Sequence, residues 1–413
     1  MSFDAIRTVM SATDLAARRP RRPKAFLKVT SVVAAAVLVA AGSTACGSRN
    51  GSNASVSQSS ATSGASPAAS GGAAPVGTAP AAGGGSAAAG KDGKIALVAG
   101  GPNVFFDSWR VSAQTAQTDY SIPTVTYVVP PTQTFETAVE ITTLNGLVAQ
   151  GYNAMAVFPD GAEAIRPTYA RIAASGVSIV DITGCSKQPT AALFCVATDV
   201  EAAAYQQATI VIAKMGGKGN LVFLAGEPTD PNTIQREDGI NKAIAQTNGA
   251  VKLLQVVAGI DSPTLATPAI QSLLAGKAAQ IDGIVSTSYY PSVAGAEIWM
   301  KNPQYQRIVF AAADNSDQVM QAVQSGAIYG SMFQDPEGQG IISAYMLNKI
   351  VKGGCKVNNS GPWTKSSLTD KLMATGFRFI DKSSVAQYVG KPYGLPDLTK
   401  TILATVPKFL TCS

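Results

Sequence analysis

Residues 94–106 have the sequence KIALVAGGPNVFF, and this stretch decides the fold that we expect for the chain. Its apolar run 95–99 lies between glycines, so it is too short for a helix and predicts a buried β-strand. Asn103, Phe105 and Phe106 follow at the start of a helical stretch. α/β proteins usually place a ligand at such a junction of strand and helix. The alternative interpretation is that the two phenylalanines serve only the core.

The alternation of strand and helix continues to about residue 381. We expect strands at 94–99, 124–129, 154–158, 177–182, 219–224, 251–257, 283–287, 308–312, 329–333 and 376–380. We expect helices at 106–117, 134–149, 163–174, 199–215, 232–246, 263–274, 292–300, 316–325 and 337–351. Apolar runs without alternation predict parallel strands that are covered on both faces. The fold class is therefore α/β, with two doubly wound, Rossmann-like lobes in succession, followed by a C-terminal tail that is mostly loop.

The first 45 residues have the pattern of a signal peptide. A basic segment, 18–28, precedes an apolar segment, 29–41, and small residues then lead to Cys46. The apolar segment is too short for a stable membrane span. Residues 43–46 resemble a bacterial lipobox, whose cysteine is lipidated, although Ser43 stands where that pattern prefers leucine. The alternative is an ordinary secretory cleavage nearby, which leaves Cys46 as an odd cysteine.

The net charge of +6 is concentrated at the N-terminus. Residues 1–45 hold seven Lys and Arg and two Asp, so the remainder is close to neutral and gives no argument for binding nucleic acid. Residues 46–90 begin with Cys46 and are otherwise almost wholly Gly, Ala, Ser and Pro. This composition predicts a disordered tether, which would hold a globular domain away from the membrane that carries the lipid anchor.

Four cysteines remain in the folded part, an even number that favours two disulfides in an exported chain. We expect the pairs Cys185–Cys195 and Cys355–Cys412. A metal site is the alternative, but the chain has no histidine and no C-x-x-C pair. Without histidine, an enzyme on this chain would depend on carboxylates, Lys or Tyr. No Walker loop or G-x-G-x-x-G motif follows the first strand, so we expect no nucleotide cofactor.

The order of elements and several local motifs resemble the type I periplasmic substrate-binding proteins, in the sugar-binding (ribose- or xylose-like) branch that serves ABC importers. The resemblance covers about residues 93–381. Beside the first strand, it rests on FPD at 158–160, IQREDG at 234–239, FAAADN at 310–315 and FQDP at 333–336. It implies two lobes joined by three crossings near 198–199, 334–335 and Gly376. The expected lobe boundaries are 91–198 with about 335–376 for lobe 1, and 199–334 with about 377–413 for lobe 2.

The resemblance also implies a ligand site between the lobes. Asp314 would accept hydrogen bonds, Arg236 would donate them and Gln334 would do both, while aromatic rings stack on the ligand. The full set of candidate ligand-binding residues is Asn103, Phe105, Phe106, Trp109, Asp160, Thr183, Arg236, Ser288, Tyr289, Asp314 and Gln334. Each has a structural alternative, such as capping a helix for Asp314 or pairing with a neighbouring carboxylate for Arg236.

The chain departs from the sugar-binding branch at two positions. Thr183 and Gly184 stand where many members have Asp-Arg, and Ser288 followed by Tyr289 stands where many have Asn. The ligand could therefore be a sugar, another polyhydroxy compound or a less polar small molecule.

The expected function is capture of a small polar ligand, a sugar or polyol, by a monomeric lipoprotein on the outer face of the cell membrane. The protein would deliver the ligand to the membrane subunits of an ABC importer, without catalysis, cofactor or nucleic acid. The alternatives are a sensing receptor of the same fold for a signalling kinase, a binder of amino-acid-like or other small molecules, and a carboxylate-dependent hydrolase. A DNA-binding regulator is excluded by the export signal and by the lack of a basic helix-turn-helix before Lys91.

Overall fold

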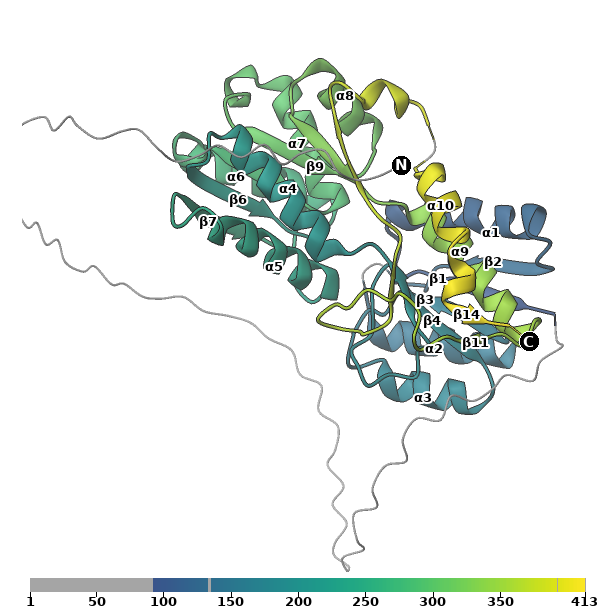
Figure 1. Cartoon of the computed structure of the whole chain (residues 1–413). Coiled ribbons are helices and arrows are strands. Elements are labelled where there is room, and N and C mark those ends of the chain that lie inside the picture. The colour runs from purple at the N-terminus through teal and green to yellow at the C-terminus, as the bar shows by residue number, and fades with distance from the viewer. Residues whose placement is uncertain (1–91, 133–134, 392, 413) are drawn as a thin grey trace, which may run out of the picture. The chain divides into compact units, whose positions relative to one another are not determined.

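The computed structural model describes residues 92–132, 135–391 and 393–412, which belong to one unit of the chain (Figure 1). The predicted signal peptide, the lipidation of Cys46 and the tether lie outside the described residues. Within the described part, no helix has the length and apolar character that a membrane crossing requires.

Lobe 1 is a parallel sheet between two layers of helices. Its strands are β1 (Lys94–Val98), β2 (Thr124–Val128), β3 (Ala154–Val157), β4 (Ser178–Ile182), β5 (Cys195–Ala197) and β12 (Leu372–Ala374). Its helices are η1 (Val104–Asp107), α1 (Ser108–Asp119), α2 (Thr137–Ala149), α3 (Arg166–Ala174) and α9 (Pro336–Val351). The strand order is β12-β5-β4-β3-β1-β2. Residues of α1 and α9 form one core with the sheet, and residues of α2 and α3 form the other.

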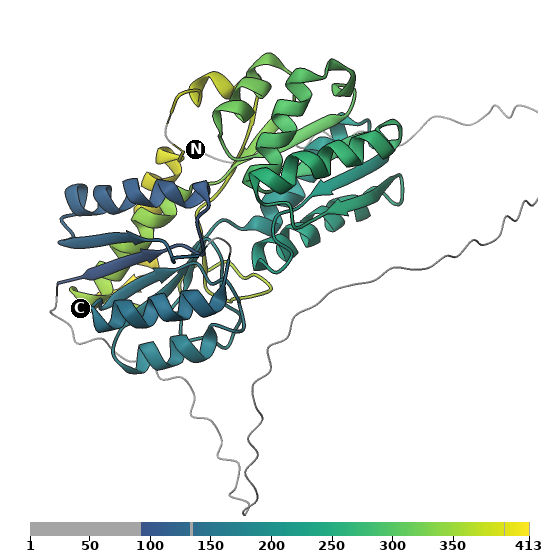
Figure 2. The same cartoon turned by 180° about the vertical axis from the view of Figure 1, so that it is seen from behind.

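Lobe 2 repeats this arrangement. Its strands are β6 (Gly219–Leu224), β7 (Val251–Val257), β8 (Gly283–Ser286), β9 (Val309–Ala313), β10 (Gly330–Phe333) and β13 (Arg378–Asp381). Its helices are α4 (Val200–Lys214), α5 (Pro231–Ala245), α6 (Pro263–Lys277), α7 (Tyr289–Lys301) and α8 (Asp317–Ser325). The strand order is β13-β10-β9-β8-β6-β7, and only the edge strand β13 is antiparallel to its neighbour among the described pairs. Helices cover both faces of this sheet, as the two opposite views show (Figures 1 and 2).

The predicted fold class is therefore confirmed. Successive residues of a strand belong to the cores on opposite faces of the sheet, as Val222 and Phe223 of β6 do. Because both faces are buried, the strands have continuous apolar sequences. The predicted strands 219–224 and 251–257 have the observed bounds, and the other predicted strands and helices begin and end within a few residues of theirs. The short strands β11 (Lys356–Val357), β12 and β14 (Leu410–Thr411) carry too few residues for a sequence pattern.

The C-terminal tail differs from the prediction, which made it mostly loop and assigned it to lobe 2. Helix α10 (Pro396–Leu403) packs beside α9 of lobe 1, as Figure 1 shows, and β14 pairs antiparallel with β11. The chain returns to lobe 1 because the apolar residues Ile402, Leu403 and Phe409 are buried in or against the core of that lobe. Because Val385 still belongs to the core of lobe 2, the chain crosses between the lobes a fourth time, after the three predicted crossings.

Both predicted disulfides are present. Cys185–Cys195 joins the segment after β4 to the start of β5, with its Cα atoms 5.6 Å apart. Cys355–Cys412 joins residues 57 positions apart, with its Cα atoms 4.2 Å apart, and ties the end of the tail to lobe 1.

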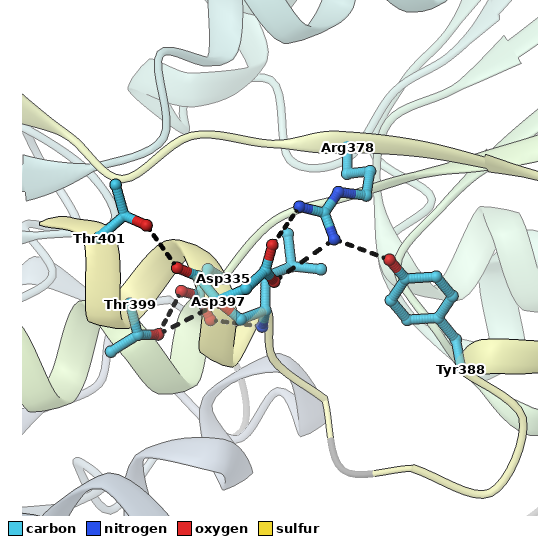
Figure 3. Close-up of polar contacts among 7 residues, drawn as sticks. Asp335, Arg378, Tyr388, Asp397, Thr399 and Thr401 are labelled. Atoms are coloured by element: carbon cyan, nitrogen blue, oxygen red, sulfur yellow. Dashed lines mark hydrogen bonds and ion pairs between the residues drawn. The ribbon is translucent and has the colours of Figure 1, made fainter. Parts of the chain in front are cut away.

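Asp335, at the second crossing, holds the tail in place. Its carboxylate caps α9 by accepting a hydrogen bond from the backbone N–H of Gly338 at 3.2 Å. It also accepts hydrogen bonds from the backbone N–H of Leu395 at 2.8 Å and from Thr399 Oγ1 at 2.6 Å (Figure 3). One buried carboxylate thus connects the second and fourth crossings.

Candidate ligand-binding site

The carboxyl ends of the two sheets meet around one pocket. It contains about 430 Å³ of space not filled by protein atoms, and part of this space is open to solvent. The residues that line it are Asn103, Phe105, Phe106, Phe135, Phe158, Thr183, Asp230, Asn232, Arg236, Asp261, Thr287, Ser288, Tyr289, Asp314 and Gln334.

Lobe 1 contributes an aromatic wall. Asn103 caps η1, because its Oδ1 accepts a hydrogen bond from the backbone N–H of Phe105 at 3.0 Å. This cap fixes Phe105 and Phe106, whose rings meet edge to face at 5.5 Å. Phe106 packs in turn on Phe158 at 5.3 Å and on Phe135 at 6.3 Å, between ring centroids. The wall is rigid because each ring is held by another ring.

The glycine after β1 makes this wall possible. A Cβ atom at Gly100 would lie 2.3 Å from Asp160 Oδ1 and 2.6 Å from the ring of Phe158. No other residue type fits there unless these side chains move.

Two polar residues occupy equivalent places in the two lobes. Thr183 follows β4 with φ of 68°, and Asp314 follows β9 with φ of 65°. Both positions lie in the left-handed region, which is unusual for any residue but glycine and especially for a β-branched one. Both positions are strand ends that carry pocket side chains, and they are two of the four non-glycine residues with positive φ in the described part of the chain.

The positive charge of Arg236, which lies on α5, acts on three carboxylates of the pocket. Burial raises the pKa of Asp230 and of Asp314 to about 6 and also raises that of Asp261, while the charge of Arg236 opposes each rise. Within the described residues the guanidinium of Arg236 forms no hydrogen bond and no ion pair within 4.0 Å. Its donors thus stay available to a ligand, in a pocket that also holds carboxylate acceptors.

Gln339 links the pocket to the crossings between the lobes. It is fully buried at the start of α9, and its Nε2 donates to Thr198 Oγ1 at 3.1 Å and to Thr375 Oγ1 at 3.3 Å. Its Oε1 accepts a hydrogen bond from the hydroxyl of Thr183. One amide therefore connects the first crossing, the third crossing and a pocket residue.

The lobes also touch directly across the pocket. Asn232 Nδ2 on α5 donates to the backbone oxygen of Thr183 at 3.2 Å. The described arrangement therefore brings groups of both lobes within hydrogen-bonding distance of each other.

The structure brings nine of the eleven candidate residues together in this pocket: Asn103, Phe105, Phe106, Thr183, Arg236, Ser288, Tyr289, Asp314 and Gln334. The other two lie outside its lining, and their prediction is corrected. Trp109 is fully buried behind Phe106, at 4.9 Å between ring centroids. Asp160 is half-buried with its carboxylate close to Gly100, and its backbone N–H donates to Glu140 Oε2 at 3.2 Å.

Sequence reasoning missed six pocket residues: Phe135, Phe158, Asp230, Asn232, Asp261 and Thr287. A signal existed for Asp230, because an Asp followed by Pro231 at the start of a predicted helix is a typical N-cap. Phe158 belongs to the motif FPD at 158–160, but the residue of this motif that the sequence predicts as ligand-binding is Asp160. Asp261 lies in a connecting segment that has no periodic pattern. Phe135 falls at the start of the helix expected at 134–149, which the structure begins at Thr137.

Lobe 1 buries a separate group of acids beside the aromatic wall. Burial raises the pKa of Glu140 well above its ordinary value, that of Asp160 to about 8 and that of Asp181 to about 7. In an unfolded chain these groups titrate near pH 4. Between about pH 4 and pH 8 the folded protein therefore binds more protons than the unfolded chain, so the free energy of unfolding falls as pH rises.

We expect the melting temperature, measured by calorimetry, to be lower at pH 8 than at pH 5. Glu140→Gln should reduce this pH dependence, because it removes one of the groups responsible. Glu163→Gln is the matched control, since Glu163 is exposed and its pKa is lowered rather than raised. A melting temperature that rises from pH 5 to pH 8, or a dependence that Glu140→Gln leaves intact, would contradict this account.

The family of the chain follows from comparison with known proteins. A model of the periplasmic binding protein domain matches residues 89–355, well over half of the chain. The chain belongs to this family. Periplasmic binding proteins of this kind are extracytoplasmic solute-binding proteins, so the predicted family is confirmed.

Solved periplasmic binding proteins share the fold. The chain resembles an ABC transporter solute-binding protein from Burkholderia graminis in complex with D-arabinose, with TM-score 0.63 and 19% identity over 72% of this chain and 98% of the other. It also resembles a protein from Actinobacillus succinogenes with bound D-allose (TM-score 0.61, 19% identity, 72% and 100% covered). A third, from Mycobacterium smegmatis, has bound glycerol (TM-score 0.61, 15% identity, 74% and 99% covered). At these identities the likeness is one of fold.

A curated periplasmic binding protein is also similar in sequence. The xylitol-binding protein of Mycolicibacterium smegmatis is 24% identical over 210 residues, which are 51% of this chain and 59% of that protein. The chain thus aligns with little more than half of this relative's length.

Among the described residues of the chain, no group of three or more acidic, Cys or His side chains could hold a metal ion.

Proposed function

We propose that this chain captures a small polyol or sugar in the pocket between its two lobes and delivers it to the membrane subunits of an ABC importer. The observation that carries this proposal is that Asp314 and Arg236 from lobe 2 line the same pocket as Phe105 and Phe106 from lobe 1. A carboxylate and a guanidinium pair with hydroxyl groups, and aromatic rings cover the C–H faces between them.

The ligand class is supported by the chemistry of the lining and by the relatives. Neutral hydroxyls can donate to Asp314 and accept from Arg236, Asn103 and Gln334, so no net charge is required of the ligand. The similar proteins are a xylitol-binding protein and solute-binding proteins with bound D-arabinose, D-allose and glycerol. We therefore place the ligand among polyols and small sugars, bound without chemical conversion.

Closure of the lobes would couple binding to delivery. A ligand that contacts both lobes favours the closed arrangement, because it forms more contacts there than in an open one. The importer would then recognise the closed surface. We further propose that a lipid on Cys46 anchors the protein to the outer face of the membrane, with the segment up to residue 90 as its tether.

Thermal shift of the purified protein against xylitol, D-arabinose, D-allose, glycerol and D-tagatose tests this proposal, with L-glutamate as the control for an amino-acid-like ligand. A specific ligand at 100 times its Kd stabilises the folded protein by about 2.7 kcal/mol, so we expect a rise of about 4 °C in the melting temperature. No rise with any polyol or sugar would contradict the proposed ligand class. A rise with L-glutamate alone would replace it.

A further inference from the structure

The fourth crossing carries a tyrosine into the neighbourhood of the ligand pocket. This segment, described at residues 388–391 and 393–399, is held at both ends. Near its start, Tyr388 accepts a hydrogen bond from Arg378 Nη1 at 2.9 Å, and near its end Leu395 and Thr399 donate to Asp335 (Figure 3). The two ends are themselves joined, because Arg378 also pairs with Asp397 at 2.5 Å. The position of Tyr393 between them is therefore fixed by the fold.

Tyr393 contacts both lobes at the edge of the pocket. Its ring meets the ring of Phe105 from lobe 1 at 5.9 Å and that of Phe333 from lobe 2 at 6.1 Å, between centroids. Its hydroxyl donates a hydrogen bond to Asp314 Oδ1. The tyrosine does not itself line the pocket, so any effect on a ligand passes through the residues it holds.

The hydrogen bonds of Asp314 are distributed unevenly between its two oxygens. Oδ1 accepts from Tyr393 and, at 3.4 Å, from Gln334 Nε2. Within the described residues no hydrogen bond reaches Oδ2. Since the side chain is only 2% exposed, the phenol supplies the main compensation for burying this charge.

We propose that Tyr393 is a positioning residue of the ligand site, whose hydroxyl holds Oδ1 of Asp314 so that Oδ2 points to a hydroxyl of the ligand. This rests on the proposed function for the identity of the ligand, but the effect of Tyr393 on Asp314 is independent of it. The C-terminal segment is therefore part of the site as well as part of the connection between the lobes.

The charged and titratable groups that face Asp314 decide whether its pKa rises or falls when the hydroxyl of Tyr393 is removed. Burial raises the pKa of Asp314, and the charge of Asp261 adds to this rise. The hydrogen bond from Tyr393, the charge of Arg236 on α5 and the hydrogen bond from Gln334 lower the pKa. Tyr289 on α7 faces the same carboxylate. Removing the phenol hydroxyl takes away one of the three effects that keep Asp314 ionised, so its pKa must rise.

Carbon-13 NMR of the aspartate carboxyl groups measures the pKa of Asp314 in the ligand-free protein. The Asp314 resonance is identified because it is lost in Asp314→Asn. We expect Tyr393→Phe to raise the pKa of Asp314 by about one unit. Tyr388→Phe is the matched control, because it removes a phenol hydroxyl from the same segment that contacts Arg378 and not Asp314. An unchanged pKa in Tyr393→Phe, or an equal rise in Tyr388→Phe, would overturn the proposal.

Calorimetric titration with xylitol and with D-arabinose at several pH values measures the effect of Tyr393→Phe on ligand affinity. We expect Tyr393→Phe to bind about tenfold more weakly at pH 7, and its affinity to start falling at a higher pH than that of the wild type as pH is lowered. Wild-type affinity and pH profile in Tyr393→Phe would overturn the role in ligand binding. If the wild type binds neither compound, the proposed ligand class fails, while the NMR experiment still decides whether Tyr393 controls Asp314.

Discussion

Replacing Asp314 with asparagine is expected to weaken ligand binding about 100-fold while the ligand-free protein stays folded. A hydrogen bond to a charged group is worth about 1.5–3 kcal/mol, and 100-fold corresponds to about 2.7 kcal/mol. Asparagine tolerates the left-handed backbone that this position requires, with φ of 65°. It also removes a buried charge, so the free energy of unfolding should not fall appreciably.

Calorimetric titration with the compound that gives the largest thermal shift measures this effect. Asp317→Asn is the matched control, since it makes the same change three residues later, at an exposed position in the first turn of α8. Its affinity should equal that of the wild type. If Asp314→Asn kept wild-type affinity, the carboxylate would have no part in binding.

Gln339→Leu is expected to lower the free energy of unfolding by about 4 kcal/mol and to change the balance between open and closed arrangements. The substitution leaves the hydroxyls of Thr183 and Thr375, both in residues at most 4% exposed, without the partner that Gln339 provides. It also removes the donor to Thr198, whose hydroxyl still donates to the backbone oxygen of Gly376 at 3.5 Å. Each buried polar group left unsatisfied costs about 1–3 kcal/mol. Because these threonines lie on two crossings and in the pocket, we expect the lobes to be held less firmly relative to each other.

Urea denaturation measures the stability, and small-angle X-ray scattering of the ligand-free protein measures the change in radius of gyration. Gln207→Leu is the control, because Gln207 is equally buried but donates only to the backbone oxygens of Ser286, Ala311 and Ala312 within lobe 2. It should destabilise the protein without changing its radius of gyration. A loss below about 1 kcal/mol in Gln339→Leu would refute the role given to this hydrogen-bond network.

The repeated elements were predictable because their patterns are local. Inner strands such as β1 and β9 are runs of apolar residues that are soon followed by glycine or a polar residue, and parallel strands bring these ends to one edge. This is why Asn103, Phe106 and Asp314, far apart in sequence, could be assigned to one site and do line one pocket. The local pattern does not say which way a side chain turns, and so it assigns Trp109 to the pocket although this side chain is fully buried behind Phe106.

The C-terminal tail was beyond prediction for a different reason. Its place depends on contacts between distant residues, such as the hydrogen bonds of Thr399 to Asp335 and the pairing of β14 with β11. None of these contacts leaves a periodic pattern in the sequence. The Cys355–Cys412 disulfide was the one long-range link that counting cysteines could suggest, and it correctly tied the tail to the body.

A crystal structure of the purified protein with the ligand that gives the largest thermal shift tests the central claim most directly. We predict that the ligand lies between the lobes, with hydroxyl groups within hydrogen-bonding distance of Asp314 and Arg236 and a C–H face against Phe105 or Phe106. A ligand bound elsewhere, or one that contacts a single lobe and leaves Asp314 free, would contradict the account.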